Sequence, residues 1–499
     1  MNQDNQNDNQ DINNGDDNHN DNNQNNNNHG DNNNINNQEN VLNPLESVTS
    51  DDDFNREIFK ALESDNINRI SDIMAYQDLT DFTMHKSSLE PDVMRAHPNT
   101  LCVAAFNGSV ESFRYLLSNG ASIFQTDDEG RSSAHFAAAS GNFEILLTIQ
   151  ENGADFSESL DNEENTPVHY AASYGQLDII KWFWSNGVSI DTPNKFGWLP
   201  LHKAAAHNQI SVVSFLLDNM EGEKQKNIES RTTNELTPLL IASKNGAAEC
   251  IEYLIQNGAS IDAVDESKAN SLIISCQNNQ LKSAQALIKN NINVNYADSL
   301  GWGALHTAIR ARSFDLVFLL LNNHANVGQL DIYDMEPIHW ASKFGLAEIV
   351  QILIQFHSNL NQKSKEGWTP LCLAAGYGSL DCVKLLADNG ADINITDKHG
   401  ITPFMFACLN GHVDIAQYLV SKKADPYVKD NRGWNVLHWA CANDHVKMVE
   451  YLLSIGIDPS LKDNDRLTAY DLAKQYKYDD VIKFMEDHGA AAHSPCIIA

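Results

Sequence analysis

Histidine and cysteine are the residues of this chain whose spacing could support metal chemistry. Imidazole and thiolate groups are preferred ligands of Zn²⁺, and a site needs three or four of them around one ion. Side chains that recur once per unit of about 33 residues instead lie along a stack, roughly 10 Å apart. The spacing therefore favours a structural role, and we expect no metal and no other cofactor. The six histidines that recur in this way are His135, His169, His202, His306, His339 and His438.

These histidines belong to a longer pattern that recurs along most of the chain. Copies of it read TPVHYAA from Thr166, LPLHKAA from Leu199, TPLCLAA from Thr369 and NVLHWAC from Asn435. The copies begin at positions 99, 132, 166, 199, 237, 270, 303, 336, 369, 402, 435 and 468, so nine of the eleven intervals are 33 residues. A fixed period of this length is the signature of a repeat array.

The residues within one unit predict two short helices. Thr followed by Pro suits a helix N-cap and the first helical position, and the paired alanines that follow let neighbouring helices approach closely. A glycine at the tenth position, as in Gly141 and Gly378, suits the left-handed turn that ends a helix. Apolar residues at helical spacing, as in Val413, Ala416 and Leu419, then predict a second helix. Because one unit cannot bury its own apolar face, stability has to come from contacts along the array.

The pattern resembles the ankyrin repeat, which reads roughly D-x-x-G-x-T-P-L-H-x-A-A-x-x-G before an apolar helix that ends in N-G-A. The resemblance covers about residues 95–490. It implies an all-α repeat protein in which each unit is a β-turn finger followed by two antiparallel helices, with the units stacked into a solenoid. It also implies that the histidines form hydrogen bonds that tie adjacent loops together.

Composition and pattern divide the chain into four parts. Residues 1–53 contain 12 acidic side chains, no basic ones and a large excess of Asn, so we expect a disordered tail. Residues 54–98 are expected to form an N-terminal helical cap and a connector, and residues 99–490 the array of about twelve repeats. Residues 491–499 form a C-terminal tail. Within the array, a polar insertion near residues 220–235 is expected to be a surface loop.

The charge balance excludes several classes of partner. The chain has 67 acidic and 34 basic side chains, a formal net charge of −33. Such a field repels phosphate groups, so we expect no nucleic-acid binding. No apolar run approaches the roughly 18–20 residues of a membrane span, and the Asn-rich N-terminus lacks the basic and apolar regions of a secretory signal. With no CxxC pair among eight cysteines, these features lead us to expect a cytoplasmic protein, and we expect a monomer.

Sequence motifs for catalysis are missing. The chain lacks a P-loop, a kinase signature set, a G-x-S-x-G, an H-E-x-x-H and a dinucleotide-binding fingerprint. Gly376-Tyr377-Gly378 is a fragment of a repeat, without the spacing and the third glycine of a nucleotide-binding loop. Since repeats and their caps account for most of the chain, we expect no enzymatic activity.

Binding residues are predicted where the repeats carry aromatic and basic residues on an exposed face. Trp precedes the first pattern position in four repeats, and in the ankyrin family this position lies at the base of the finger and faces the concave groove. The two positions after the paired alanines face the same groove. Aromatic and basic residues together are typical of interface hot spots, and the basic ones favour an acidic or aromatic-bearing peptide partner. The predicted protein-binding residues are Trp198, Trp302, Trp368, Trp434, Tyr174, Lys244, Arg310, Lys343, Phe344 and Tyr377.

A structural role for the four tryptophans remains open beside the binding role. Rings that lie flat on neighbouring fingers would stiffen the array without contacting a partner. Trp340 and Trp439, in the fifth pattern position, are open to both interpretations as well. The two roles are compatible, because one ring can do both.

The cysteines separate into two groups. Cys496 lies in the sequence Cys496-Ile497-Ile498-Ala499, a C-a-a-X box whose terminal Ala suits farnesylation. A single farnesyl group gives only reversible membrane association. The other seven occupy repeat positions that face the core, where they act as small hydrophobic residues: Cys102, Cys250, Cys276, Cys372, Cys382, Cys408 and Cys441.

Two functions follow from these features. The favoured one is a non-enzymatic scaffold or adaptor that binds an unidentified protein or peptide through the concave groove of the array. The alternative is a farnesylated peripheral membrane adaptor that recruits a client to a membrane, with Cys496 as the lipidation site.

Overall fold

A computed structural model describes residues 51–84 and 96–490. The chain divides into two units, residues 1–49 and 50–499, and only residues of the second unit are described. The tail predicted for residues 1–53 therefore lies outside the described residues, except for its last three, which begin the helix α1 (Asp51–Glu63). The predicted C-terminal tail, with Cys496, also lies outside them.

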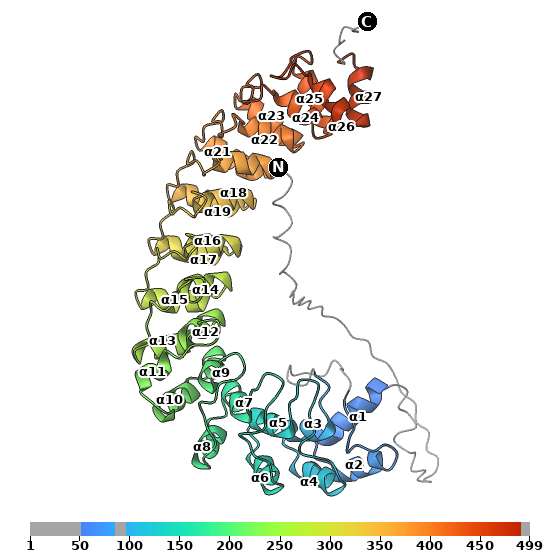
Figure 1. Cartoon of the computed structure of the whole chain (residues 1–499), viewed down its shortest axis with the longest axis vertical. Coiled ribbons are helices and arrows are strands. Elements are labelled where there is room, and N and C mark those ends of the chain that lie inside the picture. The colour runs from blue at the N-terminus through green and yellow to red at the C-terminus, as the bar shows by residue number, and fades with distance from the viewer. Residues whose placement is uncertain (1–50, 85–95, 491–499) are drawn as a thin grey trace, which may run out of the picture. The chain divides into compact units, whose positions relative to one another are not determined.

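The second unit, taken by itself, is a single row of helix pairs in which each pair packs on the next (Figure 1). The row starts with α1 and α2 (Ile67–Met74). The first helices of the later pairs are α3 (Thr100–Asn107), α5 (Ser133–Ser140), α7 (Pro167–Ser173), α9 (Pro200–Ala206), α12 (Pro238–Lys244), α14 (Ser271–Gln277), α16 (Ala304–Arg310), α18 (Pro337–Lys343), α20 (Pro370–Gly376), α22 (Pro403–Leu409), α24 (Val436–Cys441) and α26 (Ala469–Tyr476). The second helices are α4 (Val110–Ser118), α6 (Phe143–Glu151), α8 (Leu177–Ser185), α10 (Ile210–Asn219), α13 (Ala248–Gln256), α15 (Leu281–Lys289), α17 (Phe314–Asn322), α19 (Ala347–Gln355), α21 (Leu380–Asp388), α23 (Val413–Ser421), α25 (Val446–Ser454) and α27 (Asp479–Asp487).

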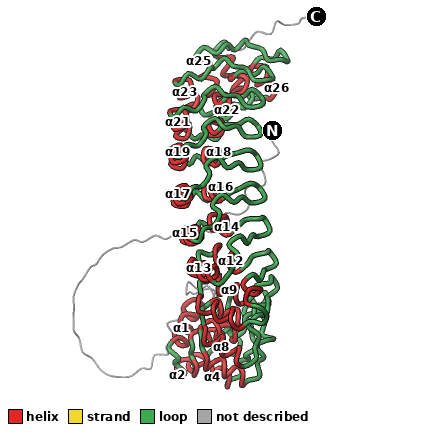
Figure 2. Tube along the Cα trace, turned by 90° about the vertical axis from the view of Figure 1, so that its left-hand side faces the viewer, coloured by secondary structure: helices red, strands yellow, loops and turns green. Residues whose placement is uncertain are grey.

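The two sets of helices lie on different sides of the row. Figure 2 shows the second helices α15, α17, α19 and α21 one above another, with the first helices α14, α16 and α18 beside them. We call the side of the first helices, together with the loops beside it, the first-helix face, and the side of the second helices the second-helix face. Each repeat is named by its first pattern position, from repeat 99 to repeat 468.

The helix boundaries follow the pattern residues. The residue at the first pattern position is the N-cap of the first helix in every repeat, and in repeat 369 the Thr369 hydroxyl accepts a hydrogen bond from the Cys372 N–H. Gly141 ends α5 in the left-handed conformation, with φ of 83°. Within the described ranges, β structure is limited to isolated bridges such as the one between Thr126 and Ser132. The predicted all-α repeat fold is thereby confirmed.

The loops between repeats, the fingers, are joined by a ladder of backbone hydrogen bonds. In one finger, Asp331 Oδ1 closes the turn by accepting from the N–H of Tyr333 (2.8 Å) and of Met335 (2.9 Å). The N–H of Ile332 donates to the carbonyl of Leu300 in the preceding finger, at 3.0 Å. Equivalent bonds occur at ten of the eleven junctions between the described fingers. The exception lies between repeats 237 and 270, so the ladder is interrupted next to the insertion.

The insertion near residues 220–235 contains a short helix, α11 (Lys224–Ile228). The sequence predicts a surface loop for this segment. The Ile228 side chain is instead fully buried and belongs to the continuous apolar core, together with Met220. The two apolar residues attach the otherwise polar segment to the array, because burying them removes apolar surface from water.

Candidate protein-binding site

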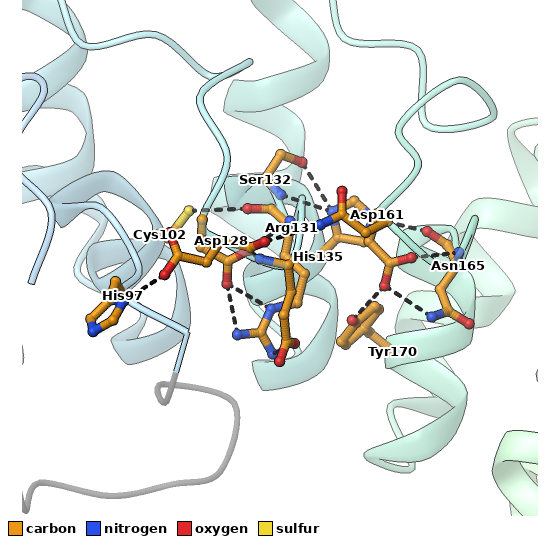
Figure 3. A network of polar contacts seen from close by, with 12 residues as sticks. His97, Cys102, Asp128, Arg131, Ser132, His135, Asp161, Asn165 and Tyr170 are labelled. Atoms are coloured by element: carbon orange, nitrogen blue, oxygen red, sulfur yellow. Dashed lines mark hydrogen bonds and ion pairs between the residues drawn. The ribbon is translucent and has the colours of Figure 1, made fainter. Parts of the chain in front are cut away.

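The recurring histidines link each repeat to the next. Figure 3 shows the first of them, His135: its Nδ1 accepts from the Ser132 N–H (3.0 Å) and its Nε2 donates to the carbonyl of Asn165 in the next repeat (3.1 Å). The other five make the same two bonds, as the resemblance implies. No cluster of three potential metal ligands occurs in residues 51–84 and 96–490. Burial lowers the pKa of four of these imidazoles to about 4: His169, His202, His306 and His339.

The cysteines of the repeats are buried and free. Cys102 occupies the histidine position, and its Sγ donates to the carbonyl of Arg131 (3.8 Å), a weaker version of the same link. Burial raises the pKa of the Cys372 thiol to about 11 and that of Cys276 to about 12. Because the thiolate is the reactive form, these cysteines act as core residues rather than as nucleophiles.

In several fingers the turn residue is an aspartate whose second oxygen binds a nearby side chain. In Figure 3 the Tyr170 hydroxyl donates to Asp161 Oδ2 at 2.7 Å. The buried Arg131 guanidinium pairs with Asp127 Oδ2, also at 2.7 Å. Arg131 precedes the first pattern position of its repeat, which is the position that tryptophan takes elsewhere. Arg131 was not predicted from the sequence, although the position that it shares with these tryptophans is a signal for it.

An aromatic and basic cluster spans repeats 303, 336 and 369 on the first-helix face. The rings of Trp302 and Trp340 lie 4.8 Å apart, centroid to centroid, and are tilted by 58°. The Arg310 guanidinium lies 5.8 Å from the centre of the Trp302 ring. Lys343 Nζ lies between two rings, 4.9 Å from Trp340 and 5.5 Å from Tyr377 of the next repeat. We call these five residues the central cluster.

Contacts beneath the central cluster hold its rings in place. Trp340 Nε1 donates to Asp331 Oδ2 at 2.9 Å, so the indole is tied to the finger of its own repeat. Phe344 packs on the same indole at 5.7 Å. Above these contacts the Tyr377 side chain is 58% exposed, and Arg310 is exposed as well. A fixed aromatic base with exposed cationic and phenolic groups on top is the arrangement expected of an interface hot spot.

The other predicted tryptophans form smaller groups of their own. Trp198 lies under Lys203 Nζ, at 5.2 Å. Trp368 packs edge-on against Phe406, at 6.3 Å. Trp434 is only 9% exposed and donates from Nε1 to Asp463 of the next finger, at 3.0 Å.

Arg432 and Trp439 complete the group around Trp434. The Arg432 guanidinium lies 4.1 Å from the centre of the Trp434 ring and 4.6 Å from that of Trp439. These tryptophans therefore pack within the array. Of the cations beside them, Lys203 is half-buried and Arg432 is exposed. Lys203 and Arg432 are cations that the sequence analysis did not select.

Two predicted residues lie outside these groups. Tyr174 of repeat 166 is exposed and lies two repeats before the insertion. Lys244 is exposed at the end of α12, and no ring or carboxylate of the described residues pairs with it. The structure thus brings together five of the ten predicted residues, namely Trp302, Arg310, Lys343, Phe344 and Tyr377, and adds Trp340.

The fold and these loops define a class of protein. A family model described as ankyrin repeats (3 copies) matches the chain in overlapping segments between residues 76 and 494. This covers well over half of the sequence, so the chain belongs to the ankyrin repeat family. Ankyrin repeats are in general protein–protein interaction modules.

Similarity to individual proteins is local. The chain is 35% identical over 82 residues to ankyrin repeat and SOCS box protein 2 of Bos taurus and of Homo sapiens, which is 16% of this chain and 12% of each relative. It is 24% identical over 181 residues to alpha-latrotoxin-Lg1a of Latrodectus geometricus, covering 36% of this chain and 10% of the toxin. The chain thus spans about a tenth of the length of these relatives.

No helix in the described residues is long and apolar enough to cross a membrane.

Proposed function

We propose that this chain is a non-enzymatic scaffold or adaptor that binds a partner protein on its first-helix face, with the central cluster as the main contact. The observation that carries the proposal is the placement of Lys343 between the rings of Trp340 and Tyr377, which joins two repeats into one prepared surface. A side chain that is already held in its bound position loses little conformational entropy on binding.

The chemistry of the cluster supports a partner segment with acidic and aromatic side chains. Arg310 and Lys343 offer donors to a carboxylate, and the exposed Tyr377 ring offers an aromatic face. The chain as a whole is strongly acidic, with a net charge of −33. A local basic site on an acidic protein favours acidic ligands at that site and repels them elsewhere, which gives specificity.

The proposal can be tested by quantitative affinity capture with the full chain. The test variant carries Arg310→Ala and Tyr377→Ala, which remove exposed groups and leave the half-buried tryptophans in place. The matched control is Tyr427→Ala, because Tyr427 is 63% exposed but lies in the loop after α23. The same partner should be captured by the unchanged chain and the control, and reduced at least tenfold by the double variant. Equal capture by all three proteins would contradict the proposal.

A further inference from the structure

The second-helix face carries an exposed pair of phenylalanines on α17. Phe314 is 41% and Phe318 is 50% exposed, and their rings are stacked with centroids 6.3 Å apart. The position of Phe318 is polar in ten of the twelve repeats, where it is Arg114, Lys181, Ser214, Glu252, Gln285, Gln351, Lys384, Gln417, Glu450 or Lys483. Two adjacent exposed rings form a contiguous apolar patch, and such a patch is a candidate interaction site.

A hollow opens beside these rings. It has a volume of about 500 Å³, and its apolar walls come from Phe314 and Phe318 of α17, Ala347 and Ile352 of α19 and Leu385 of α21. Ala347 helps to open it, since the same position holds a larger residue in every repeat except repeat 237. Figure 2 shows these three helices in sequence along the second-helix face. The hollow has the size of a small binding site.

The walls of the hollow determine what backbone can enter it. They are helices, whose backbone groups are already paired within each helix, so an extended strand would find no ladder to join. The polar side chains that line the hollow are few: Glu348, Gln351 and Gln355. An occupant must therefore satisfy its own backbone hydrogen bonds, and a helix does so while presenting side chains one turn apart.

The three helices around the hollow, α17, α19 and α21, carry four acidic side chains and one basic side chain, Lys384, which neighbours Leu385. Asp315, Glu348 and Asp381 occupy the first turns of α17, α19 and α21, and in the described part of the chain none of the three forms an ion pair. Asp388, at the end of α21, is by contrast paired with Lys422 at 2.6 Å. Unpaired carboxylates beside an apolar hollow favour a ligand with basic side chains next to its apolar ones.

We propose that the hollow between α17 and α19 binds an amphipathic helix of a partner protein, which places two apolar side chains one turn apart against Phe314 and Phe318 and basic side chains beside Asp315, Glu348 and Asp381. This site is separate from the central cluster and does not depend on the function proposed for it. The chain would then hold one partner segment on each face of the same three repeats.

The test uses three labelled synthetic peptides of fourteen residues and the full-length chain. The first peptide is a helix with two leucines four residues apart and lysines beside them. The second keeps the lysines and replaces both leucines by serine, and the third keeps the leucines and replaces the lysines by glutamate. Fluorescence anisotropy is measured with the unchanged chain, with Phe318→Gln and with Leu147→Gln, which introduces glutamine in place of the apolar residue at the equivalent position of repeat 132.

The first peptide is expected to bind the unchanged chain and Leu147→Gln. Its affinity for Phe318→Gln should be about tenfold lower, because burial of a phenyl ring is lost. The two altered peptides should bind the unchanged chain about tenfold more weakly, because the second loses burial of its leucines and the third loses its charge pairing. Since glutamine is the natural residue at this position in three other repeats, Phe318→Gln should fold normally, which circular dichroism checks. Equal binding by the two protein variants would show only general attraction to an acidic chain and would overturn the proposal. So would no binding, or a dimer that Phe318→Gln abolishes in sedimentation.

Discussion

The two faces of repeats 303 to 369 use aromatic residues in different ways. On the first-helix face, the rings of the central cluster have partners in the chain: Trp340 donates to Asp331, and Lys343 lies over its ring. On the second-helix face, Phe314 and Phe318 stack on each other beside the hollow. Aromatic residues of the first kind contribute to the fold as well as to binding, whereas those of the second kind can be changed at little cost to stability.

Lowering the pH should reduce the free energy of unfolding more than any single substitution. The residues that respond lie in the first helices. His306 and His339 are buried with a pKa of about 4, lowered by burial from an ordinary value near 6.5. The unfolded chain therefore takes up protons that the folded chain does not, so stability is lost as the pH falls from about 6.5 towards 4. Each site contributes on the order of 3 kcal/mol to this loss.

Urea unfolding at pH 7.5, 5.5 and 4.5 measures this loss, with His339→Cys as the control. Cysteine occupies the same position naturally in repeats 99 and 369. The variant should be less stable than the unchanged chain at pH 7.5, and the difference should narrow at pH 4.5. A difference that stays constant over this range would show that the histidine is not held neutral.

Truncating one aromatic residue on each face should give the next largest difference in the free energy of unfolding. Trp340→Ala removes a half-buried indole and leaves Asp331 Oδ2 without its donor, so we expect a loss of about 3 kcal/mol in the free energy of unfolding. Phe318→Ala removes an exposed ring, and the expected change is within about 0.5 kcal/mol. Chemical denaturation of the two variants compares them directly, and equal losses would remove the distinction between the faces.

A smaller effect is expected at Glu336, the N-cap of α18, which carries Trp340 and Lys343. Burial raises the pKa of its carboxyl to about 7, and one of its oxygens has no hydrogen-bond partner in the described residues. The contribution of the Glu336 carboxyl to the free energy of unfolding is therefore fully present below about pH 4.5, and it is lost as the pH rises through 7.

Glu336→Thr should therefore stabilise the chain by about 1 kcal/mol at pH 8, because threonine caps the helix as it does in repeat 369 and the buried charge is removed. At pH 5 the gain should be smaller, since the carboxyl is then protonated. Thermal unfolding at the two pH values measures both gains. A gain that is larger at pH 5 than at pH 8 would contradict this account of Glu336.

The fold could be predicted from the sequence because its determinants are local. The N-cap, the paired alanines and the left-handed turn recur within a few residues of one another, so the period alone places the helices. α11 was not predicted, because Met220 and Ile228 are isolated apolar residues in a polar segment and only the neighbouring repeat shows that they are buried. The interrupted finger ladder between repeats 237 and 270 likewise depends on two loops far apart in the sequence.

The candidate sites were predictable to different degrees. The positions of the central cluster could be predicted, but its contacts could not, since Lys343 contacts a ring of the following repeat. Trp340 and Lys343 are three residues apart on one helix, and this spacing is a signal that would have paired them. The hollow beside Phe318 was missed altogether. Aligning the second helices of the repeats would have shown a phenylalanine where polar residues stand.

The claim that the first-helix face binds a partner can be tested most directly by photocrosslinking in cells. p-Benzoylphenylalanine is placed at Tyr377 in the full chain, and in a matched protein at the equally exposed Tyr427. We predict that illumination links Tyr377 to one discrete protein, that this product is lost with Arg310→Ala, and that Tyr427 does not form it. No product at Tyr377, or the same products from both positions, would contradict the account.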